Sequence, residues 1–155
     1  MIKVLFVCHG NICRSPLAEF VLKDLVHKKG LSELFAIASA ATSREEIGNP
    51  VHPGTRKILN SFGIRCDGKR AVQMTLKDYQ EYDYIIAMDQ RNITNIQRII
   101  GEDRKHSVKR LLDYTERSGD IADPWYTGDF KQTYQDVYEG CTALLEAICN
   151  KDKIA

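Results

Sequence analysis

The sequence lacks a long apolar run, an export signal and an excess of one charge, and each absence excludes a class of protein. No apolar run approaches the ~18 residues that are needed to span a bilayer. The short apolar run at the N-terminus has neither the length nor the cleavage pattern of a signal peptide. The 22 basic and 21 acidic side chains leave a formal net charge of +1, whereas a general nucleic-acid binder usually carries a basic excess on one face. We therefore expect a cytoplasmic protein with neither a membrane nor a nucleic acid as its partner.

Metal-binding and disulfide patterns are also missing. The 5 cysteines are odd in number, and no two of them have the two-residue spacing of a zinc ribbon. Disulfide bonds are rare in the cytoplasm, so a special cysteine in this chain is expected to be reactive rather than structural. We interpret three scattered histidines as surface or turn residues rather than metal ligands, namely His27, His52 and His106. We expect no metal and no cofactor.

The chain shows no internal boundary. No linker, internal repeat or low-complexity tract divides the 155 residues, which predicts a single domain over residues 1–155. Short apolar runs that suit buried strands alternate with apolar stripes at helical spacing. The predicted strands cover residues 2–7, 34–39, 84–88 and 106–111. The predicted helices cover residues 15–29, 53–61, 93–100 and 130–148. This alternation predicts an α/β fold in which helices cover both faces of a parallel sheet.

The turn after the first predicted strand holds the residues that point to chemistry. Ligands of parallel α/β sheets bind beyond the carboxyl ends of the strands, and residues 8–15 lie at such an end. A loop there can turn backbone N–H groups inward, and the following helix adds its positive end, which together form an anion site of phosphate size. Gly10, and less readily Asn11, can adopt the positive φ that such a loop needs. The predicted phosphate-binding residues are His9, Gly10, Asn11, Ile12, Cys13, Arg14 and Ser15.

Cys8 and Arg14 occupy the two ends of this loop. Arg14 offers a planar fork that matches two phosphate oxygens. Cys8 lies in the field of Arg14 and of the loop dipoles, which favour its thiolate and make it a nucleophile. The loop can therefore accept a phosphoryl group on sulfur without a metal. Taken alone, a cysteine at the end of a strand is more often a small buried apolar residue, and Ser15 can either cap the next helix or donate to the Cys8 thiolate.

A second segment, near the C-terminus, offers the acid that this chemistry needs. Phosphoryl transfer to sulfur requires an acid for the leaving oxygen and then a base for water, and one carboxyl group can serve as both. Asp123 is the candidate, because Pro124 fixes the backbone beside it and Trp125 and Tyr126 can flank a substrate ring. The alternative interpretation of this segment is a surface Asp-Pro turn before the last helix.

The two segments together resemble the low-molecular-weight protein tyrosine phosphatases. The loop reads CHGNICRSP at residues 8–16, and the acid segment reads DPWY at residues 123–126. The likeness continues along the chain through Ser39-Ala40 and through DYIIAMD at residues 83–89. The order and spacing of these segments agree with the family as well. A nucleophile loop near the N-terminus combined with an Asp-Pro acid near the C-terminus is a highly specific pair.

The resemblance implies a reaction, a fold and a role for each residue. Cys8 would be the nucleophile, Arg14 the phosphate clamp and Asp123 the general acid and then base. The expected supports of the loop are Asn11, Ser15 and Ser39. The implied fold has three layers, with a four-stranded parallel sheet flanked by helices on both faces. The implied reaction is hydrolysis of phosphotyrosine monoesters through a cysteinyl-phosphate, with phosphotyrosine-containing proteins as partners. We expect the chain to act as a monomer or weak homodimer.

Some positions depart from the family pattern. His9 stands where the family mostly has a small or aliphatic residue, and residues 69–73 lack the His and Arg that are common there. Glu45 and Glu46 occupy the loop that usually places an aromatic residue on one wall of the cleft, and they would repel acidic peptides. Ile12 suits an aromatic ring better than a guanidinium, which favours phosphotyrosine over phosphoarginine. The residues expected to flank the substrate are Ile12, Glu45, Glu46, Trp125 and Tyr126.

Two other functions remain as alternatives. A thiol-dependent arsenate reductase shares this fold and loop, but it needs further cysteines close together near residues 80–90, where this chain has none. A catalytically silent phosphate-binding module would not need a nucleophile, a phosphate clamp and an acid together.

Cys13 takes part in no step of the chemistry, and its simplest role is packing. It also follows Cys8 in a tightly curled loop, so we expect peroxide to inactivate the enzyme reversibly through a bond between these two cysteines.

Overall fold

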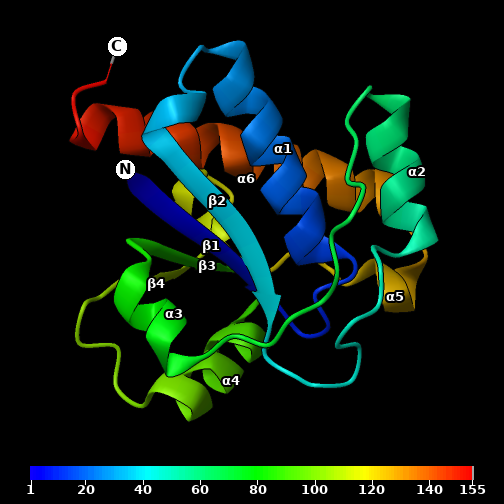
Figure 1. The fold of residues 1–155 in the computed structure, drawn as a ribbon, viewed down its shortest axis with the longest axis horizontal. Helices are drawn as coiled ribbons and strands as arrows, with labels where there is room; N and C mark the ends of the chain where they lie inside the picture. The colour runs from blue at the N-terminus through cyan, green and yellow to red at the C-terminus, as the bar shows by residue number, and fades with distance from the viewer. Residues whose placement is uncertain (155) are drawn as a thin grey trace.

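Four parallel strands form the central layer of the protein, and helices cover both faces of that layer (Figure 1). The computed structural model describes residues 1–154. The strands lie in the order β2-β1-β3-β4 and comprise β1 (Ile2–Cys8), β2 (Phe35–Ala41), β3 (Tyr84–Ala87) and β4 (Val108–Arg110). The helices are α1 (Arg14–Lys28), α2 (Pro53–Ser61), α3 (Leu76–Glu81), α4 (Gln90–Ile100), α5 (Pro124–Thr127) and α6 (Phe130–Lys151). The predicted three-layer α/β fold is confirmed.

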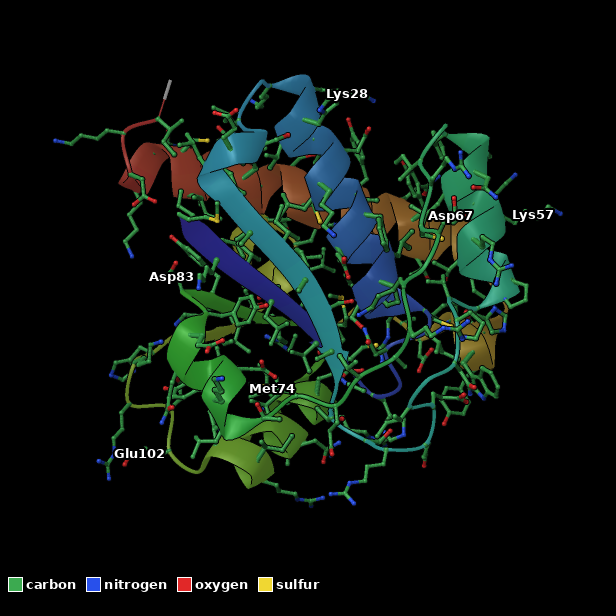
Figure 2. All side chains as sticks on the ribbon, viewed as in Figure 1. Lys28, Lys57, Asp67, Met74, Asp83 and Glu102 are labelled. Carbon is green, nitrogen blue, oxygen red and sulfur yellow. The ribbon has the colours of Figure 1, made fainter. Side chains whose placement is uncertain are left out.

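Each face of the sheet is buried under its own set of helices. Successive side chains of a strand point to opposite faces. Val4 and Phe6 of β1 therefore pack with α1, α2 and α6, whereas Leu5 and Val7 pack with α3 and α4 (Figure 1). Burial on both faces explains why β1 is an almost continuous apolar run. Lys28, Lys57 and Glu102 lie on the outside of the layers, as Figure 2 shows.

The strand ends differ from the prediction by one or two residues, and local features account for three of these differences. β2 extends to Ala41, which still pairs with the end of β1. β3 stops before Met88, because the Met88 amide donates to the side chain of Asn92 at 3.0 Å. β4 begins only at Val108, since the backbone of His106 has a φ of 53°, which no extended strand adopts.

Helix α1 begins one residue earlier than predicted, and its first turn is built differently. Cys13 is the N-cap residue and makes no side-chain cap bond. Ser15 therefore lies inside the first turn, and of its two expected roles it does not have that of the helix cap. The hydroxyl of Ser15 instead forms hydrogen bonds with Cys8 and Asn11 of the loop that precedes the helix.

No helix within residues 1–154 has the length and apolar character that a bilayer crossing requires.

Two short helices were not predicted. Helix α3 has only 6 residues, but Thr75 and Asp78 form a complete capping box at its start. Helix α5 has 4 residues, with Asp123 as its N-cap, Pro124 in its first turn and Gly128 in a left-handed conformation at its end. Helices this short do not contain enough residues for apolar side chains to recur at helical spacing, so the sequence pattern did not predict α3 or α5. The segment interpreted as a possible surface turn is thus a capped helical turn.

Candidate active site

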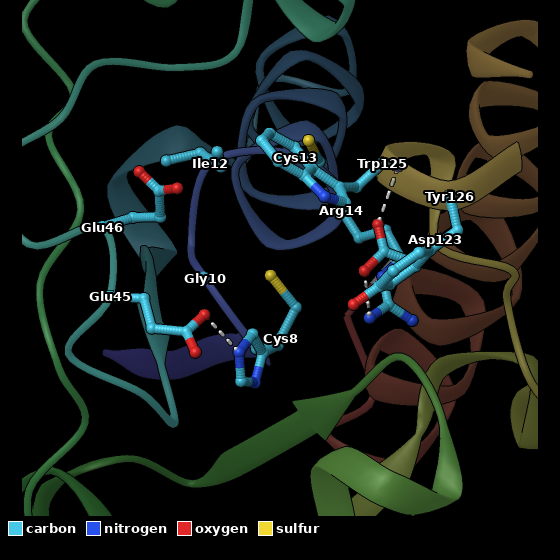
Figure 3. A pocket seen from close by; sticks show the side chains of 11 residues that line it. Cys8, Gly10, Ile12, Cys13, Arg14, Glu45, Glu46, Asp123, Trp125 and Tyr126 are labelled. Carbon is cyan, nitrogen blue, oxygen red and sulfur yellow. Dashed lines mark hydrogen bonds and ion pairs between the residues drawn. The ribbon is translucent and has the colours of Figure 1, made fainter. Parts of the chain in front are cut away.

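A cavity of about 110 Å³ lies beyond the carboxyl end of β1 and brings together residues from distant parts of the chain. Its lining consists of Cys8, His9, Gly10, Ile12, Cys13, Arg14, Glu45, Glu46, Asp123, Trp125 and Tyr126. Figure 3 shows Glu45 and Glu46 on one side of Cys8 and Asp123 with Tyr126 on the other. Every residue expected to flank the substrate lines this cavity. The predicted nucleophile, clamp and acid line it as well.

The sulfur of Cys8 accepts hydrogen bonds inside the loop. Cys8 is 3% exposed, and its Sγ lies 3.0 Å from the Ser15 hydroxyl and accepts from the Asn11 amide at 3.3 Å. The direction of the Ser15 bond follows from its other partner. The Asn11 side chain donates to Ser15 Oγ at 2.8 Å, so the single hydroxyl proton of Ser15 is left to point at Cys8. Both bonds therefore stabilise a thiolate.

The side chain of Asn11 holds the loop in place through three bonds. Its Oδ1 accepts from the backbone amide of Val72 at 3.1 Å, which fixes the orientation of the carboxamide because that amide can only donate. Its Nδ2 then donates to the hydroxyls of Ser15 and Ser39, at 2.8 and 2.9 Å. Asn11 also has a positive φ of 60°, whereas Gly10, which was predicted to take that conformation more readily, has none. Asparagine tolerates this backbone when its side chain is bonded locally.

Charged residues behind the loop extend this network. The Ser39 hydroxyl accepts from Asn11 and donates to Glu19 Oε1 at 2.6 Å. Glu19 is 5% exposed, and Lys23 donates to its other oxygen at 2.6 Å. Lys69 donates to the Ser39 carbonyl at 2.9 Å, and burial lowers the pKa of this lysine despite the nearby Glu19. Neither Glu19 nor Lys69 was predicted as a site residue, because each reaches the loop through contacts between segments that are distant in the chain.

Arg14 is 3% exposed and held from three sides. Its Nη1 donates to Asp89 at 2.6 Å and to the Ile121 carbonyl at 2.9 Å, and its Nη2 lies 3.4 Å from Asp123. Burial opposes the charge, but the neighbouring Cys8 and the two carboxylates hold the pKa of Arg14 above its ordinary value. Asp89 was not predicted as a site residue. Its place two residues after the buried strand β3, which lies beside β1 in the sheet, is the signal that could have found it.

Asp123 faces Cys8 across the cavity from the start of α5 (Figure 3). Its Oδ1 accepts from the Trp125 amide at 3.0 Å, as an N-cap does, and its Oδ2 is turned toward Arg14. The side chain is 23% exposed, so it reaches both the cavity and solvent water. The cap bond holds one oxygen and leaves the other oxygen for chemistry.

A family model described as low molecular weight phosphotyrosine protein phosphatase matches residues 3–154. The chain belongs to this family. Low molecular weight protein-tyrosine-phosphatase YfkJ of Bacillus subtilis is 47% identical over 150 residues, which cover 96% of each chain. The crystal structure of YfkJ has a TM-score of 0.93 at 47% identity and covers 99% of this chain and 97% of its own. A low molecular weight protein tyrosine phosphatase from Streptococcus pyogenes, SP-PTP, has a TM-score of 0.86 at 42% identity, over 95% and 93% of the two chains.

The two departures beside the nucleophile contact each other in this phosphatase. His9 Nε2 lies 2.7 Å from Glu45 Oε2, which joins the phosphate loop to the loop after β2. The side chains are 43% and 70% exposed, so water screens the pair. Glu46 accepts from the Asn49 side chain and lines the same wall. Both glutamates therefore line the catalytic cavity, and their contact with a substrate stays a prediction.

Cys13 is buried at the far end of the loop from Cys8. It packs with Ile12, Ala71 and Phe130, and burial raises its pKa to about 12, with the charge of Cys8 adding to the effect. Cys13 is therefore a thiol at neutral pH. The expected capture of oxidised Cys8 by this thiol stays a prediction.

Residues 1–154 contain no group of three or more histidine, cysteine and acidic side chains arranged to hold a metal ion.

Proposed function

We propose that the phosphatase hydrolyses phosphotyrosine monoesters on proteins through a cysteinyl-phosphate intermediate on Cys8. One observation carries the proposal. The Cys8 sulfur accepts bonds from Ser15 and Asn11 at the floor of a cavity whose opposite wall holds Asp123. Donors that point at the sulfur stabilise a thiolate, which is the reactive form. Membership of the phosphotyrosine protein phosphatase family supports the same reaction.

The first step transfers the phosphoryl group to sulfur. The Cys8 thiolate forms a bond to phosphorus while the bond between phosphorus and the tyrosine oxygen breaks. Asp123, as a carboxylic acid, gives its proton to that oxygen, so tyrosine leaves as a neutral phenol. The backbone N–H groups of residues 9–15 and the guanidinium of Arg14 bind the phosphate oxygens and stabilise their charge in the transition state.

The second step regenerates the enzyme. Asp123, now a carboxylate, takes a proton from a water molecule while the water oxygen forms a bond to phosphorus. The bond between sulfur and phosphorus breaks, inorganic phosphate leaves, and Cys8 returns as the thiolate that Ser15 and Asn11 stabilise. Asp123 returns as the acid. Each group therefore ends the cycle in its starting form.

The lining of the cavity supports an aromatic substrate. Ile12, Trp125 and Tyr126 supply apolar and aromatic surface around Cys8, and the last two are 57% and 79% exposed at the entrance. A phosphotyrosine ring can pack between such residues, whereas a guanidinium would lose hydration there. We also propose that residues 1–155 act as one domain in the cytoplasm, as a monomer or weak homodimer on phosphotyrosine-containing proteins. A reducing compartment keeps the Cys8 thiol available.

The proposed function is tested by turnover and by trapping the intermediate. With EDTA present, the protein is expected to hydrolyse p-nitrophenyl phosphate and phosphotyrosine peptides at undiminished rates. Acid quenching during turnover, followed by mass spectrometry, should place one phosphate on the peptide that contains Cys8. A silent phosphate-binding module would show neither result, and an arsenate reductase would consume arsenate together with thiols. Loss of turnover in EDTA would contradict the mechanism.

The two glutamates at the entrance predict a charge preference. Replacing both residues, Glu45→Gln with Glu46→Gln, is expected to raise kcat/KM for acidic phosphopeptides about threefold relative to neutral ones, since exposed charge pairs are worth 1 kcal/mol or less. Added salt should reduce this gain by screening. The matched control is Glu33→Gln with Glu116→Gln, which changes the net charge equally at exposed sites outside the cavity. Equal gains on acidic and neutral peptides would place Glu45 and Glu46 away from the bound substrate.

A further inference from the structure

A second cavity adjoins the catalytic one and has no role in the reaction described above. It has a volume of about 280 Å³ and shares His9, Arg14, Asp123 and Tyr126 with the catalytic cavity. Its remaining lining comes from the N-terminal half of α4 and the residue before it, namely Asp89, Arg91, Asn92 and Asn95. The start of α4 therefore lies beside the cavity that would hold the phosphotyrosine.

The acidic groups of the second cavity already have partners. Asp89 accepts from the Asn92 amide at 2.7 Å through one oxygen and from Arg14 at 2.6 Å through the other. Asp123 accepts from the Trp125 amide and is turned toward Arg14. The two carboxylates thus face one another through a shared guanidinium. Neither of them is an unsatisfied acceptor that would attract a cation.

Three side chains of α4 that line the cavity offer donors without a partner among the described residues. Within residues 1–154, the guanidinium of Arg91 makes no hydrogen bond or ion pair, although it is exposed at the cavity wall. Asn92 is 1% exposed, and its Oδ1 accepts from the amides of Met88 and Asp89, which leaves its amino group without a partner in this part of the chain. The side-chain oxygen of Asn95 likewise accepts a hydrogen bond from Arg98. The α4 side of the cavity thus offers a group of free donors, one of them cationic, and such a group is complementary to a carboxylate.

We infer that this cavity binds an acidic side chain, aspartate or glutamate, of the phosphotyrosine peptide, with Arg91 as the cationic contact and Asn92 and Asn95 as neutral donors. The inference rests on the proposed function. The N-terminal end of α4 adds its positive partial charge to the same place. Glu45 and Glu46 lie on the wall of the catalytic cavity and repel acids there. The cleft thus carries opposite charge preferences in its two parts, and it selects an acidic residue on one side of the phosphotyrosine only.

The test uses three phosphotyrosine peptides that share an otherwise neutral sequence. One has no acid, one has glutamate two residues before the phosphotyrosine, and one has glutamate two residues after it. At low salt, one of the two acidic peptides is expected to exceed the neutral peptide about threefold in kcat/KM, mainly through KM, as a single exposed charge pair allows. Arg91→Gln should abolish this advantage, and Arg91→Glu should turn it into a disadvantage. Turnover of p-nitrophenyl phosphate, which has no peptide chain, should stay unchanged in both variants.

The matched control is Arg104→Gln, which removes the same charge from an 85% exposed side chain outside the cavity. This control should keep the advantage of the preferred peptide. The inference is overturned if neither acidic peptide exceeds the neutral one, if Arg91→Gln keeps the advantage, or if Arg104→Gln loses it equally. Failure of the proposed function is a separate result, because the parent protein would then not turn over p-nitrophenyl phosphate at all.

Discussion

Cys8→Ser is expected to lower kcat for p-nitrophenyl phosphate by at least about 10⁵-fold, on the scale seen when a catalytic nucleophile is removed. A serine hydroxyl is not ionised at neutral pH, and nothing in the loop takes its proton. The backbone cradle and Arg14 remain, so the variant should still bind inorganic phosphate or vanadate with an affinity near that of the parent. Steady-state kinetics measure the first effect, and calorimetric titration measures the second.

The control for this substitution is Cys13→Ser, a change of the same type in the same loop. Cys13 is buried against Ile12, Ala71 and Phe130 and donates nothing to the Cys8 sulfur. It should therefore keep most of the parent turnover. Thermal unfolding of both variants shows whether either loses stability. A Cys8→Ser protein that still turns over, or a Cys13→Ser protein that is folded yet inactive, would reverse the assignment of the nucleophile.

Asp123→Asn is expected to separate substrates by their leaving groups. Tyrosine leaves poorly, because its hydroxyl has an ordinary pKa of about 10, so it depends on the proton that Asp123 supplies. Its turnover should fall by about 10²–10⁴-fold, the usual range for loss of a general acid. p-Nitrophenolate leaves well without a proton, so the first step with p-nitrophenyl phosphate should slow much less. Single-turnover measurements on the two substrates isolate this step from the hydrolysis that follows.

Asparagine can replace aspartate as a helix cap, so this substitution should leave α5 in place. The matched control is Asp129→Asn. Asp129 caps α6 in the same way, through the Gln132 amide at 3.0 Å, and does not line the cavity. It should lose little activity on either substrate. An Asp123→Asn enzyme with unchanged phosphotyrosine turnover, or with equal losses on both substrates in the first step, would rule out Asp123 as the acid.

The sheet and the long helices could be predicted from the sequence because burial imposes a pattern on many residues at once. The apolar run of β1 follows from burial on both faces, and the apolar spacing of α6 follows from its packing on one of those faces. The phosphate loop could be located because its residues are consecutive in the chain, and consecutive residues are also neighbours in the structure. The acid was harder to place, since the capping bond of Asp123 looks the same in a surface turn.

What the sequence could not show are contacts whose partners lie far apart in the chain. The choice of Asn11 over Gly10 for the positive φ depends on Ser39 and Val72, which bond its side chain. The role of Asp89 depends on the alignment of β3 beside β1, which brings its carboxylate to Arg14. No local propensity encodes either fact. For the same reason, the residues alone left open whether Ser15 caps the helix or donates to the Cys8 sulfur.

The partners of Arg14 have a consequence for the order in which a newly made chain becomes active. Arg14 meets Asp89, Ile121 and Asp123 at separations of 75, 107 and 109 residues. A nascent chain carries its nucleophile from the eighth residue onward, but Arg14 lacks its contacts with Ile121 and Asp123 until about four-fifths of the protein is synthesised. Contacts of such long range form late in folding. The phosphate clamp is therefore completed late, and dephosphorylation begins only after the chain is nearly complete.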